Sequence, residues 1–259
     1  MPDGPWMNSS PKESADELTI ETKRDLVRPL LAPSEPGDAM TAYYALLHDA
    51  KRVRLTLGTT PTGRVDRFAA VCQTGRDLFV PLVVLRAPQE GVGDLLHKAL
   101  EVGRPYTIIT KPAFRDEIAE VVLLQHQQIN AVHILDPSAY RPIINVMVQP
   151  GEGPFRFEIR IDDVVVAAAG VNWRSRRLAD MYVYTDSQFA GRGWGKAVGA
   201  ACVKVLLEAH LVPLYTAALE NAASMRLAEA LGFRDSEARE LECRGRLRQI
   251  DPLAPRVPR

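Results

Sequence analysis

The stretch AGRGWGKAVGAA, residues 190–201, combines four glycines with an arginine, a tryptophan and a lysine. It lies between an apolar segment typical of a strand and a long amphipathic segment. Glycines let a ligand approach the backbone closely because they carry no Cβ atom. The first amides of a helix lack partners within the helix, and the helix dipole favours negative charge beside them. We therefore expect a helix that begins in this loop and binds a phosphate or pyrophosphate, with Arg192 and Lys196 adding positive charge.

Two familiar nucleotide loops do not match this stretch. A P-loop requires a glycine where Ala190 stands and a hydroxyl where Ala197 stands. The dinucleotide fingerprint, counted from Gly191, requires a glycine at Lys196. A plain strand-to-helix turn without a ligand is the simpler alternative, but three alternating glycines next to two cations favour a ligand.

Composition limits the class of protein. The chain has 259 residues, 46% apolar and 25% charged, with a formal net charge of zero, which is ordinary for a globular protein. The balanced charge argues against a nucleic-acid partner, and no run of about 18 apolar residues predicts a membrane span. The three cysteines and five histidines show no metal-ligand spacing, so we expect no metal. The start of the sequence lacks a basic-then-apolar leader, so we expect a cytoplasmic protein.

The pattern along the chain predicts three segments. Residues 1–39, rich in Pro, Ser and acidic residues, are expected to form a flexible arm. Residues 40–147 are expected to form an N-terminal α/β domain, and residues 148–259 a second domain. In the second domain the alternation and the apolar runs predict the order strand, turn, strand, strand, loop, helix, strand, short helix, strand. The fold class is therefore α+β or mixed α/β.

The C-terminal pattern resembles the GNAT superfamily of acetyl-CoA-dependent N-acetyltransferases. The matching parts are YVYTDSQFAGRGWGKA (182–197) and, about two dozen residues later, NAASMRLAEALGF (221–233). The resemblance covers roughly residues 155–248 and implies a GNAT-like fold there. The earlier half either completes that fold through residues 92–150 or forms a second, degenerate GNAT-like half over residues 41–147. We favour the second arrangement because the lengths are similar.

The resemblance implies acetyl-CoA as a co-substrate. The amides of the glycine loop would hold its pyrophosphate, and the backbone of the preceding strand would pair with its pantetheine arm. Asn221 would contact the coenzyme or act only as a helix cap, and Ser224 lies one turn further on. Ala190 departs from the family, which usually has Arg or Gln there. The implied coenzyme-binding residues are Val183, Tyr184, Thr185, Gly191, Arg192, Gly193, Trp194, Gly195, Lys196, Ala197, Asn221 and Ser224.

The catalytic groups are less defined by the resemblance. Many members carry a tyrosine where Ala228 stands, and that tyrosine protonates the leaving thiolate. We take Tyr184 as the candidate acid, with Tyr182 and Tyr215 as alternatives. Asp180 is the candidate base, because family bases often lie on the strand before the loop, and Glu158 is the alternative. A backbone N–H near Val183 or Tyr184 would polarise the thioester carbonyl.

The expected function is acetyl transfer from acetyl-CoA to an amine of a small molecule or a protein, by direct attack. A non-catalytic acyl-CoA sensor and a transferase for another acyl group or acceptor are the alternatives. The expected partner is an amine-bearing acceptor that the sequence does not identify, and a homodimer stays open. RSRR (174–177) is interpreted as a solvated turn rather than a patch for an acidic partner.

Overall fold

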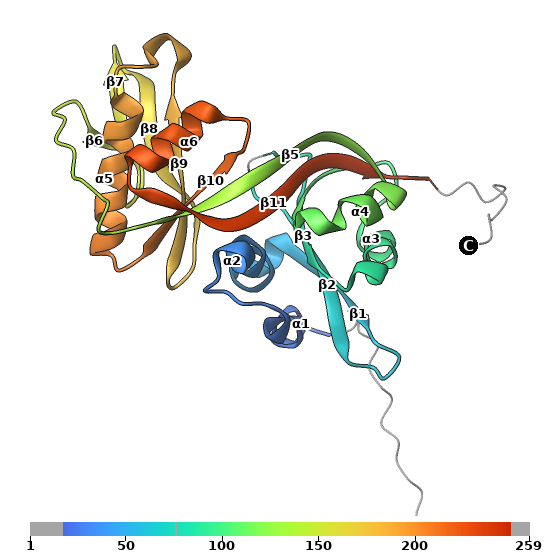
Figure 1. The fold of residues 1–259 in the computed structure, drawn as a ribbon. Coiled ribbons are helices and arrows are strands. Elements are labelled where there is room, and N and C mark those ends of the chain that lie inside the picture. The colour runs from blue at the N-terminus through green and yellow to red at the C-terminus, as the bar shows by residue number, and fades with distance from the viewer. Residues whose placement is uncertain (1–17, 76, 250–259) are drawn as a thin grey trace, which may run out of the picture.

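A computed structural model describes residues 18–75 and 77–249, and these contain one large mixed sheet. The strands lie in the order β1-β2-β3-β4-β11-β5-β10-β9-β8-β7-β6 (Figure 1). Their bounds are β1 Val53–Thr59, β2 Val65–Cys72, β3 Leu82–Arg86, β4 Pro105–Thr110, β5 Val122–Leu135, β6 Gln149–Pro150, β7 Phe157–Ile161, β8 Val164–Arg174, β9 Leu178–Thr185, β10 Val212–Ala218 and β11 Phe233–Leu247.

Helices cover both faces of the sheet. The α-helices are α1 Ile20–Val27, α2 Pro36–Ala42, α3 Val92–Ala99, α4 Arg115–Val121, α5 Trp194–Glu208 and α6 Ala222–Ala230, and a π-helical turn, η2 Tyr43–Leu47, continues α2. Short 3-10 turns are η1 Arg28–Leu30, η3 Ala50–Arg52, η4 Gln89–Gly91, η5 Pro112–Phe114 and η6 Ser187–Phe189.

The two halves of the chain repeat one order of elements. Strands β1, β2 and β3 form an antiparallel meander, and α3 then connects β3 to the parallel strand β4. Strands β7, β8 and β9 form a second meander, and α5 connects β9 to the parallel strand β10. Each half ends with one more helix and a long strand, α4 and β5 in the first, α6 and β11 in the second. The mixed α/β class with a second half of like build is as predicted.

The two halves exchange their last strands. Strand β5 pairs with β10 of the second half, and β11 pairs with β4 of the first half. The two exchanged strands also pair with each other, from Phe233↔Leu135 to Leu247↔Val122. Figure 1 shows β5 and β11 running together from one half to the other. The expected domain boundary at residue 147 stays a prediction. Strands from both sides of this boundary belong to one sheet.

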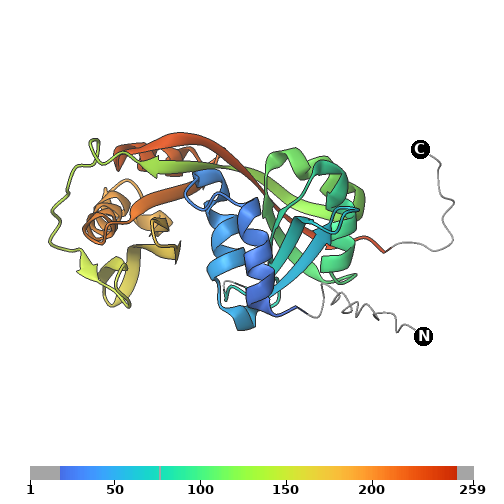
Figure 2. The ribbon, with the colours of Figure 1, turned by 90° about the horizontal axis from the view of Figure 1, so that it is seen from below.

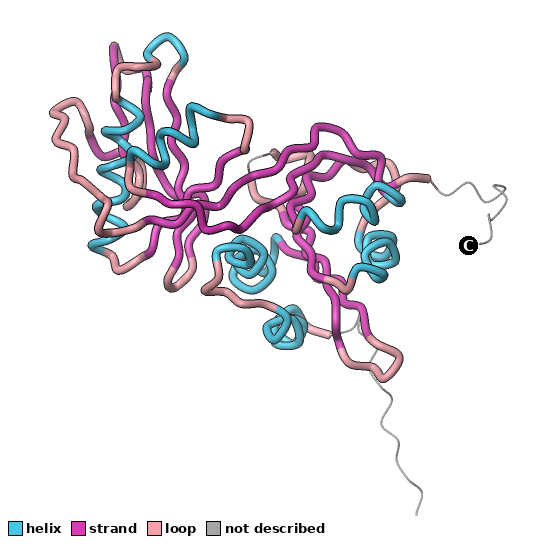
Figure 3. Tube along the Cα trace, in the orientation of Figure 1, coloured by secondary structure: helices cyan, strands magenta, loops and turns pink. Residues whose placement is uncertain are grey.

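Three clusters of buried side chains surround the sheet. One joins α1, α2 and η2 to strands of both halves and includes Val27, Phe68 and Leu214. The second lies under α5 and α6, and the third under α3 and α4. Figures 2 and 3 show α1 and α2 beside the middle of the sheet, with the other helices at its two ends. The N-terminal helices therefore pack against strands of both halves.

Several expected boundaries are wrong. From Ile20 onward the predicted flexible arm forms helices, and Val27 and Ala39 are buried in the core; residues 1–17 lie outside the described residues. The apolar residues of 111–124 fall on one face and predict a helix over that whole range, but the helix ends at Val121, because Val122 begins β5 and pairs with Leu247. Local periodicity does not reveal such long-range pairing, and tertiary context overrides the propensity of a short segment.

Candidate functional site

Strands β9 and β10 separate within the sheet. Their parallel ladder runs from Leu178↔Val212 to Tyr215↔Met181 and ends there. Strand β9 continues to Thr185 alongside β8, while β10 continues to Ala218 alongside β5. The two strands thus diverge from a vertex at Met181 and Tyr215, which leaves an opening between residues 182–185 and 216–218.

Hydrogen bonds show which backbone groups face this opening. The amide of Val212 on β10 donates to the carbonyl of Arg177 at 2.7 Å, and the amide of Asp186 donates to the carbonyl of Val166 at 2.9 Å. Successive residues of a strand direct their N–H and C=O groups to opposite sides. The backbone N–H and C=O groups of odd-numbered residues of β9 therefore point towards β10, and those of even-numbered residues point towards β8. The N–H and C=O groups of Val183 and Thr185 point into the opening, where an extended ligand can pair with them as an added strand.

The glycine loop follows β9 and begins α5. Gly191 and Gly193 both have φ of +77°, a conformation that suits glycine, and a Cβ atom there would meet nothing within 4 Å. Gly193 is the N-cap and has no side chain to satisfy the first amides. The amide of Ala197 donates to the Gly193 carbonyl at 3.0 Å, so the amides before it precede the helical hydrogen bonds. The start of α5 therefore presents amides without helical partners, the arrangement that favours anion binding.

The start of α5 lies directly against the strand opening. A Cβ atom on Gly195 would lie 2.6 Å from Thr185 Oγ1, so glycine permits this close approach. The guanidinium of Arg192 lies 5.2 Å from the ring centre of Phe189 and 5.3 Å from that of Trp194. These two rings stack on each other, and Arg192 and Lys196 are exposed. The structure thus brings together the expected loop residues, two cations and the open strand.

Two predicted residues lie at the other side of the opening. Asn221 is the N-cap of α6, and its Oδ1 accepts a hydrogen bond from the Ser224 amide at 3.0 Å. Ser224 Oγ lies 2.8 Å from the hydroxyl of Tyr215. Burial raises the pKa of Tyr215, against the effect of the Ser224 hydrogen bond. A protonated hydroxyl therefore lies at the vertex, although the sequence could not place Tyr215 there because strand register is not visible in it.

The other two tyrosines lie on the opposite face of β9 from α5. Tyr182 accepts a hydrogen bond from Arg156 Nη1 at 3.0 Å. Tyr184 has 49% of its surface exposed, and its backbone groups face Ala168 on β8 rather than the opening. Of the two amides considered for the carbonyl oxygen, the one of Val183 therefore has the required direction.

The candidate bases differ in environment. Asp180 is 3% exposed and accepts hydrogen bonds from Asn172 Nδ2 at 2.8 Å and Thr216 Oγ1 at 3.1 Å. It lies two residues before Tyr182, on the same face of β9. Glu158 is held between two arginines, and the hydrogen bond from Arg160 holds its pKa below the ordinary value. A carboxylate with a lowered pKa is a weaker base.

Sequence reasoning missed Glu240 of β11. Its side chain is buried, and its Oε2 has no hydrogen-bond partner among the described residues. Burial, with the nearby charge of Asp180 second, raises the pKa of Glu240 to about 8. The alternating polar pattern of β11 suggests a solvent-facing position for this residue. Only the exchange of strands puts Glu240 beneath the N-terminal helices.

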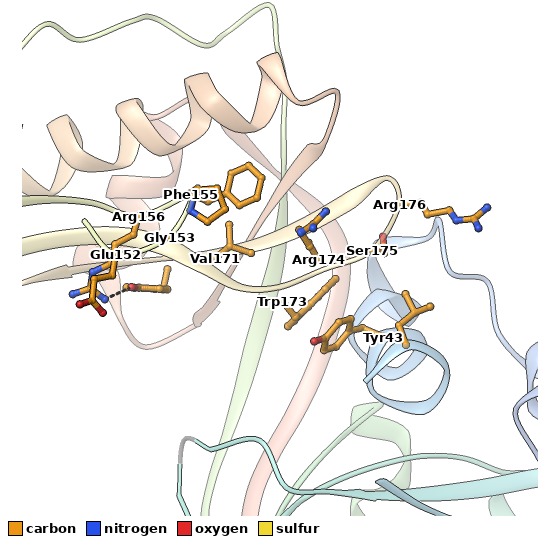
Figure 4. Close-up of a pocket in the computed structure, with 14 residues that line it drawn as sticks. Tyr43, Glu152, Gly153, Phe155, Arg156, Val171, Trp173, Arg174, Ser175 and Arg176 are labelled. Atoms are coloured by element: carbon orange, nitrogen blue, oxygen red, sulfur yellow. Dashed lines mark hydrogen bonds between the residues drawn. The ribbon is translucent and has the colours of Figure 1, made fainter. Parts of the chain in front are cut away.

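A cleft of about 820 Å³ lies along the end of β8, with Trp173 and Tyr43 on the face away from α5 and Phe155 and Val171 on the side of α5 (Figure 4). Its lining consists of residues 152–156, the end of β8, Tyr182, and Tyr43 with Leu47 from η2. Figure 4 labels residues of the first two groups and Tyr43. A Cβ atom on Gly170 would lie 2.8 Å from the Tyr182 hydroxyl, so this glycine gives the tyrosine ring its place. The cleft is therefore built from both halves of the chain and ends at the first residue of the open strand.

Within residues 18–75 and 77–249 no group of three or more His, Cys, Asp or Glu side chains could hold a metal ion. No helix in the described part of the chain is long and apolar enough to cross a membrane.

Comparison with known proteins agrees with this geometry. The family model described as GNAT acetyltransferase matches residues 154–240. A GCN5-related N-acetyltransferase-like protein from Streptococcus suis is 14% identical, with a TM-score of 0.61 over 88% of this chain and 100% of that chain. A tandem GNAT protein from the clavulanic acid biosynthesis pathway is 12% identical, with a TM-score of 0.56 over 90% of this chain and 96% of that chain. A GNAT-family putative acetyltransferase from Novosphingobium aromaticivorans is 17% identical, with a TM-score of 0.53 over 70% of this chain and 89% of that chain. No curated protein matches.

These matches define the class of protein. The fold is that of acyltransferases, in a two-part GNAT-like arrangement. Residues 154–240 match the GNAT acetyltransferase family model and form a GNAT acetyltransferase domain.

Proposed function

We propose that this acyltransferase moves an acetyl group from acetyl-CoA to an amine by direct attack. The observation that carries the proposal is the strand opening, whose inward-facing backbone groups end at an open helix N-terminus. A pantetheine arm and a pyrophosphate require these two features in this order. The amine nitrogen forms a bond to the acetyl carbon, and the carbon–sulfur bond breaks. The amine proton must pass to a base, and the leaving thiolate must receive a proton.

The glycine loop would hold the pyrophosphate. The amides of Trp194, Gly195 and Lys196 would donate to its oxygens, and the charges of Arg192 and Lys196 would add to the helix dipole. The N–H of Val183, rather than that of Tyr184, would donate to the thioester carbonyl oxygen. Only odd-numbered residues of β9 direct their backbone N–H and C=O groups into the opening. Side chains on β9 would matter less than its main chain.

Tyr215 would replace the tyrosine missing at Ala228. Its hydroxyl lies at the vertex of the opening and is held by Ser224, so it can donate a proton to the leaving sulfur. Asp180 is the candidate proton acceptor, because it lies closest along β9 to the opening on the face of the cleft. We prefer Tyr215 to the exposed Tyr184 for the acid role, and Asp180 to the ion-paired Glu158 for the base role.

Titration of the protein with acetyl-CoA tests the coenzyme site. The first variant is Gly193→Glu, which adds a negative charge at the helix start. Its matched control is Gly103→Glu, because Gly103 is also exposed, has φ of +79° and has open space around it, but lies in the first half. Binding by the wild type and by Gly103→Glu, with loss in Gly193→Glu, supports the proposal. Equal affinity in all three proteins contradicts it.

A second titration and an amine screen separate the alternatives. Tighter binding of succinyl-CoA or longer acyl-CoA than of acetyl-CoA would favour transfer of another acyl group. Tight acetyl-CoA binding without turnover of any tested amine would favour a sensor.

A further inference from the structure

We propose that the 820 Å³ cleft binds the acceptor, and that the acceptor is a primary amine joined through an apolar body to an anionic group, with the size of a dipeptide. This inference rests on the proposed function, because it names the second substrate of that reaction. It also gives the N-terminal half a role, since η2 forms one wall of the cleft.

The place of the cleft relates it to the reaction. Tyr182 lines the cleft and is also the first residue of β9 beyond the ladder with β10. The next residue, Val183, carries the N–H that faces the opening. An amine beside Tyr182 is therefore at the part of the cleft that lies nearest to the proposed thioester carbonyl.

The middle and one wall of the cleft are apolar. Tyr43 of η2 stacks on Trp173 of β8, with ring centres 5.4 Å apart and planes at 22°. Phe155 and Val171 also line it, and Leu47 leaves 51% of its surface exposed (Figure 4). Ligand sites usually combine such apolar walls with a few polar groups that fix orientation. The acceptor therefore carries an apolar body.

The charges of the cleft differ between its two ends. Figure 4 shows Glu152 beside Arg156 at one end and Arg174 towards the other. Arg156 is occupied, because it contacts Glu158 and the Tyr182 hydroxyl. Among the described residues Arg174 makes no ion pair, and its guanidinium lies 5.8 Å over the Phe155 ring. Arg174, with Arg176 beside it in the lining, would bind an anionic group, and Glu152 would favour an ammonium at the Tyr182 end.

A buried donor supports an incomplete site at the Arg174 end. Trp173 is 4% exposed, and its indole Nε1 has no hydrogen-bond partner among the described residues. A buried donor without an acceptor costs free energy. A ligand that brings an acceptor atom close to the indole would satisfy this donor after a small shift of the Trp173 ring.

The length of the cleft sets the size of the acceptor. Gly170 pairs with Tyr182, and Arg174 lies four residues further along β8, past a bulge. At about 3.3 Å per residue this is a span of about 13 Å, shortened by the bulge and by the reach of the arginine. At this rise a dipeptide spans about 7 Å, so the Arg174 side chain must reach over the remaining distance, and one amino acid would leave a wider gap.

The test compares leucyl-phenylalanine with leucyl-phenylalanine amide, which share the amine and the apolar body and differ in the terminal charge. Release of the coenzyme A thiol measures kcat/KM, and calorimetry without acetyl-CoA measures direct binding. The variant is Arg174→Gln. Arg177→Gln is the control, because Arg177 is an exposed arginine of the same turn that does not line the cleft.

The acid should be preferred over the amide by about tenfold or more in both measurements, as for a charge-assisted hydrogen bond. Arg174→Gln should reduce this preference to about twofold or less, and Arg177→Gln should keep it. A second variant, Leu47→Asp, should weaken both dipeptides, because the exposed Leu47 side chain contributes an apolar wall.

Equal use of acid and amide by the wild type, or equal effects of the two arginine variants, would overturn the inference. The direct titration separates its failure from that of the proposed function. Acid preference in calorimetry without acetyl-CoA binding would retain the cleft ligand and reject acetyl transfer. Acetyl-CoA turnover without acid preference would retain acetyl transfer and reject the anionic acceptor in the cleft.

Discussion

The hydroxyl of Tyr215 and Oγ of Ser224 lie 2.8 Å apart at the vertex where β9 and β10 separate. Tyr215→Phe removes the proton donor and keeps the ring in its buried place. We expect kcat to fall about 100-fold, at the lower end for general acid catalysis because a thiolate is a good leaving group, while acetyl-CoA affinity stays close to that of the wild type. Steady-state kinetics and calorimetry measure these two quantities. Ser224→Ala should lose less activity, and full activity of Tyr215→Phe would refute the acid role.

Gly195 and Thr185 set the distance between α5 and the open strand. In Gly195→Ala the new Cβ would lie 2.6 Å from Thr185 Oγ1, so the Thr185 side chain must turn or the helix start must move away from β9. We expect acetyl-CoA affinity to fall about tenfold, or about 1.4 kcal/mol. Adding Thr185→Ala removes the hydroxyl and should restore part of the affinity. No difference between the single and the double variant in calorimetry would show that this contact does not position the loop.

Glu240 should make stability depend on pH. Its pKa is raised to about 8, so the folded protein keeps the proton between about pH 4.5 and pH 8, where the unfolded chain releases it. The free energy of unfolding therefore falls as the pH rises through this window, by an amount on the order of a few kcal/mol. Glu240→Gln stays neutral and should lose this dependence. Thermal unfolding at pH 6 and pH 9 tests it, with Glu229→Gln, an exposed site on α6, as the control.

The Arg86–Asp38 ion pair fixes α2 to β3. Arg86 donates to Asp38 Oδ1 from Nε at 2.9 Å and from Nη2 at 2.6 Å. Burial alone would raise the pKa of Asp38, but the charge and hydrogen bonds of Arg86 outweigh it and hold that pKa below its ordinary value. Asp38→Asn leaves the guanidinium poorly compensated and should destabilise the fold by about 3 kcal/mol.

Denaturant unfolding measures this loss, and the double variant Asp38→Leu with Arg86→Met should be less destabilised than Asp38→Asn. The double variant should also retain dipeptide binding, since α2 leads into η2 and the cleft wall. Equal stability of Asp38→Asn and the wild type would show that the pair contributes nothing.

Strand exchange predicts that the halves do not fold separately. Without residues 1–147, β10 loses its partner β5 and β11 loses both β5 and β4. Unpaired strand edges of this length favour aggregation. We expect the fragment 148–259 to lack a cooperative unfolding transition on its own and to gain one when 1–147 is expressed with it. Circular dichroism with thermal melting measures this, and a cooperative melt of 148–259 alone would contradict it.

The sequence predicted the parts of the site that depend on neighbouring residues. Alternating glycines between a strand and a helix predicted the open start of α5, and Asn221 was recognised as a helix cap from its position before an apolar helix. These features depend on backbone conformations and hydrogen bonds within a few residues, which local sequence determines. The same holds for the meander of β7, β8 and β9, which the alternation of β7 and the apolar run of β8 predict.

Only the tertiary structure decided which residues meet across the sheet. Tyr215 reaches the vertex because the ladder with β9 ends at Met181, and Glu240 is buried because β11 crosses into the first half. Tyr43 lies against Trp173 although 129 positions separate them in the sequence. Strand register and exchange depend on contacts between distant segments, and many pairings fit the same alternation of apolar and polar residues. The sequence by itself thus determined a GNAT-like glycine loop and its helix, whereas long-range pairing and packing decided the position of Tyr215, the burial of Glu240 and the shape of the cleft.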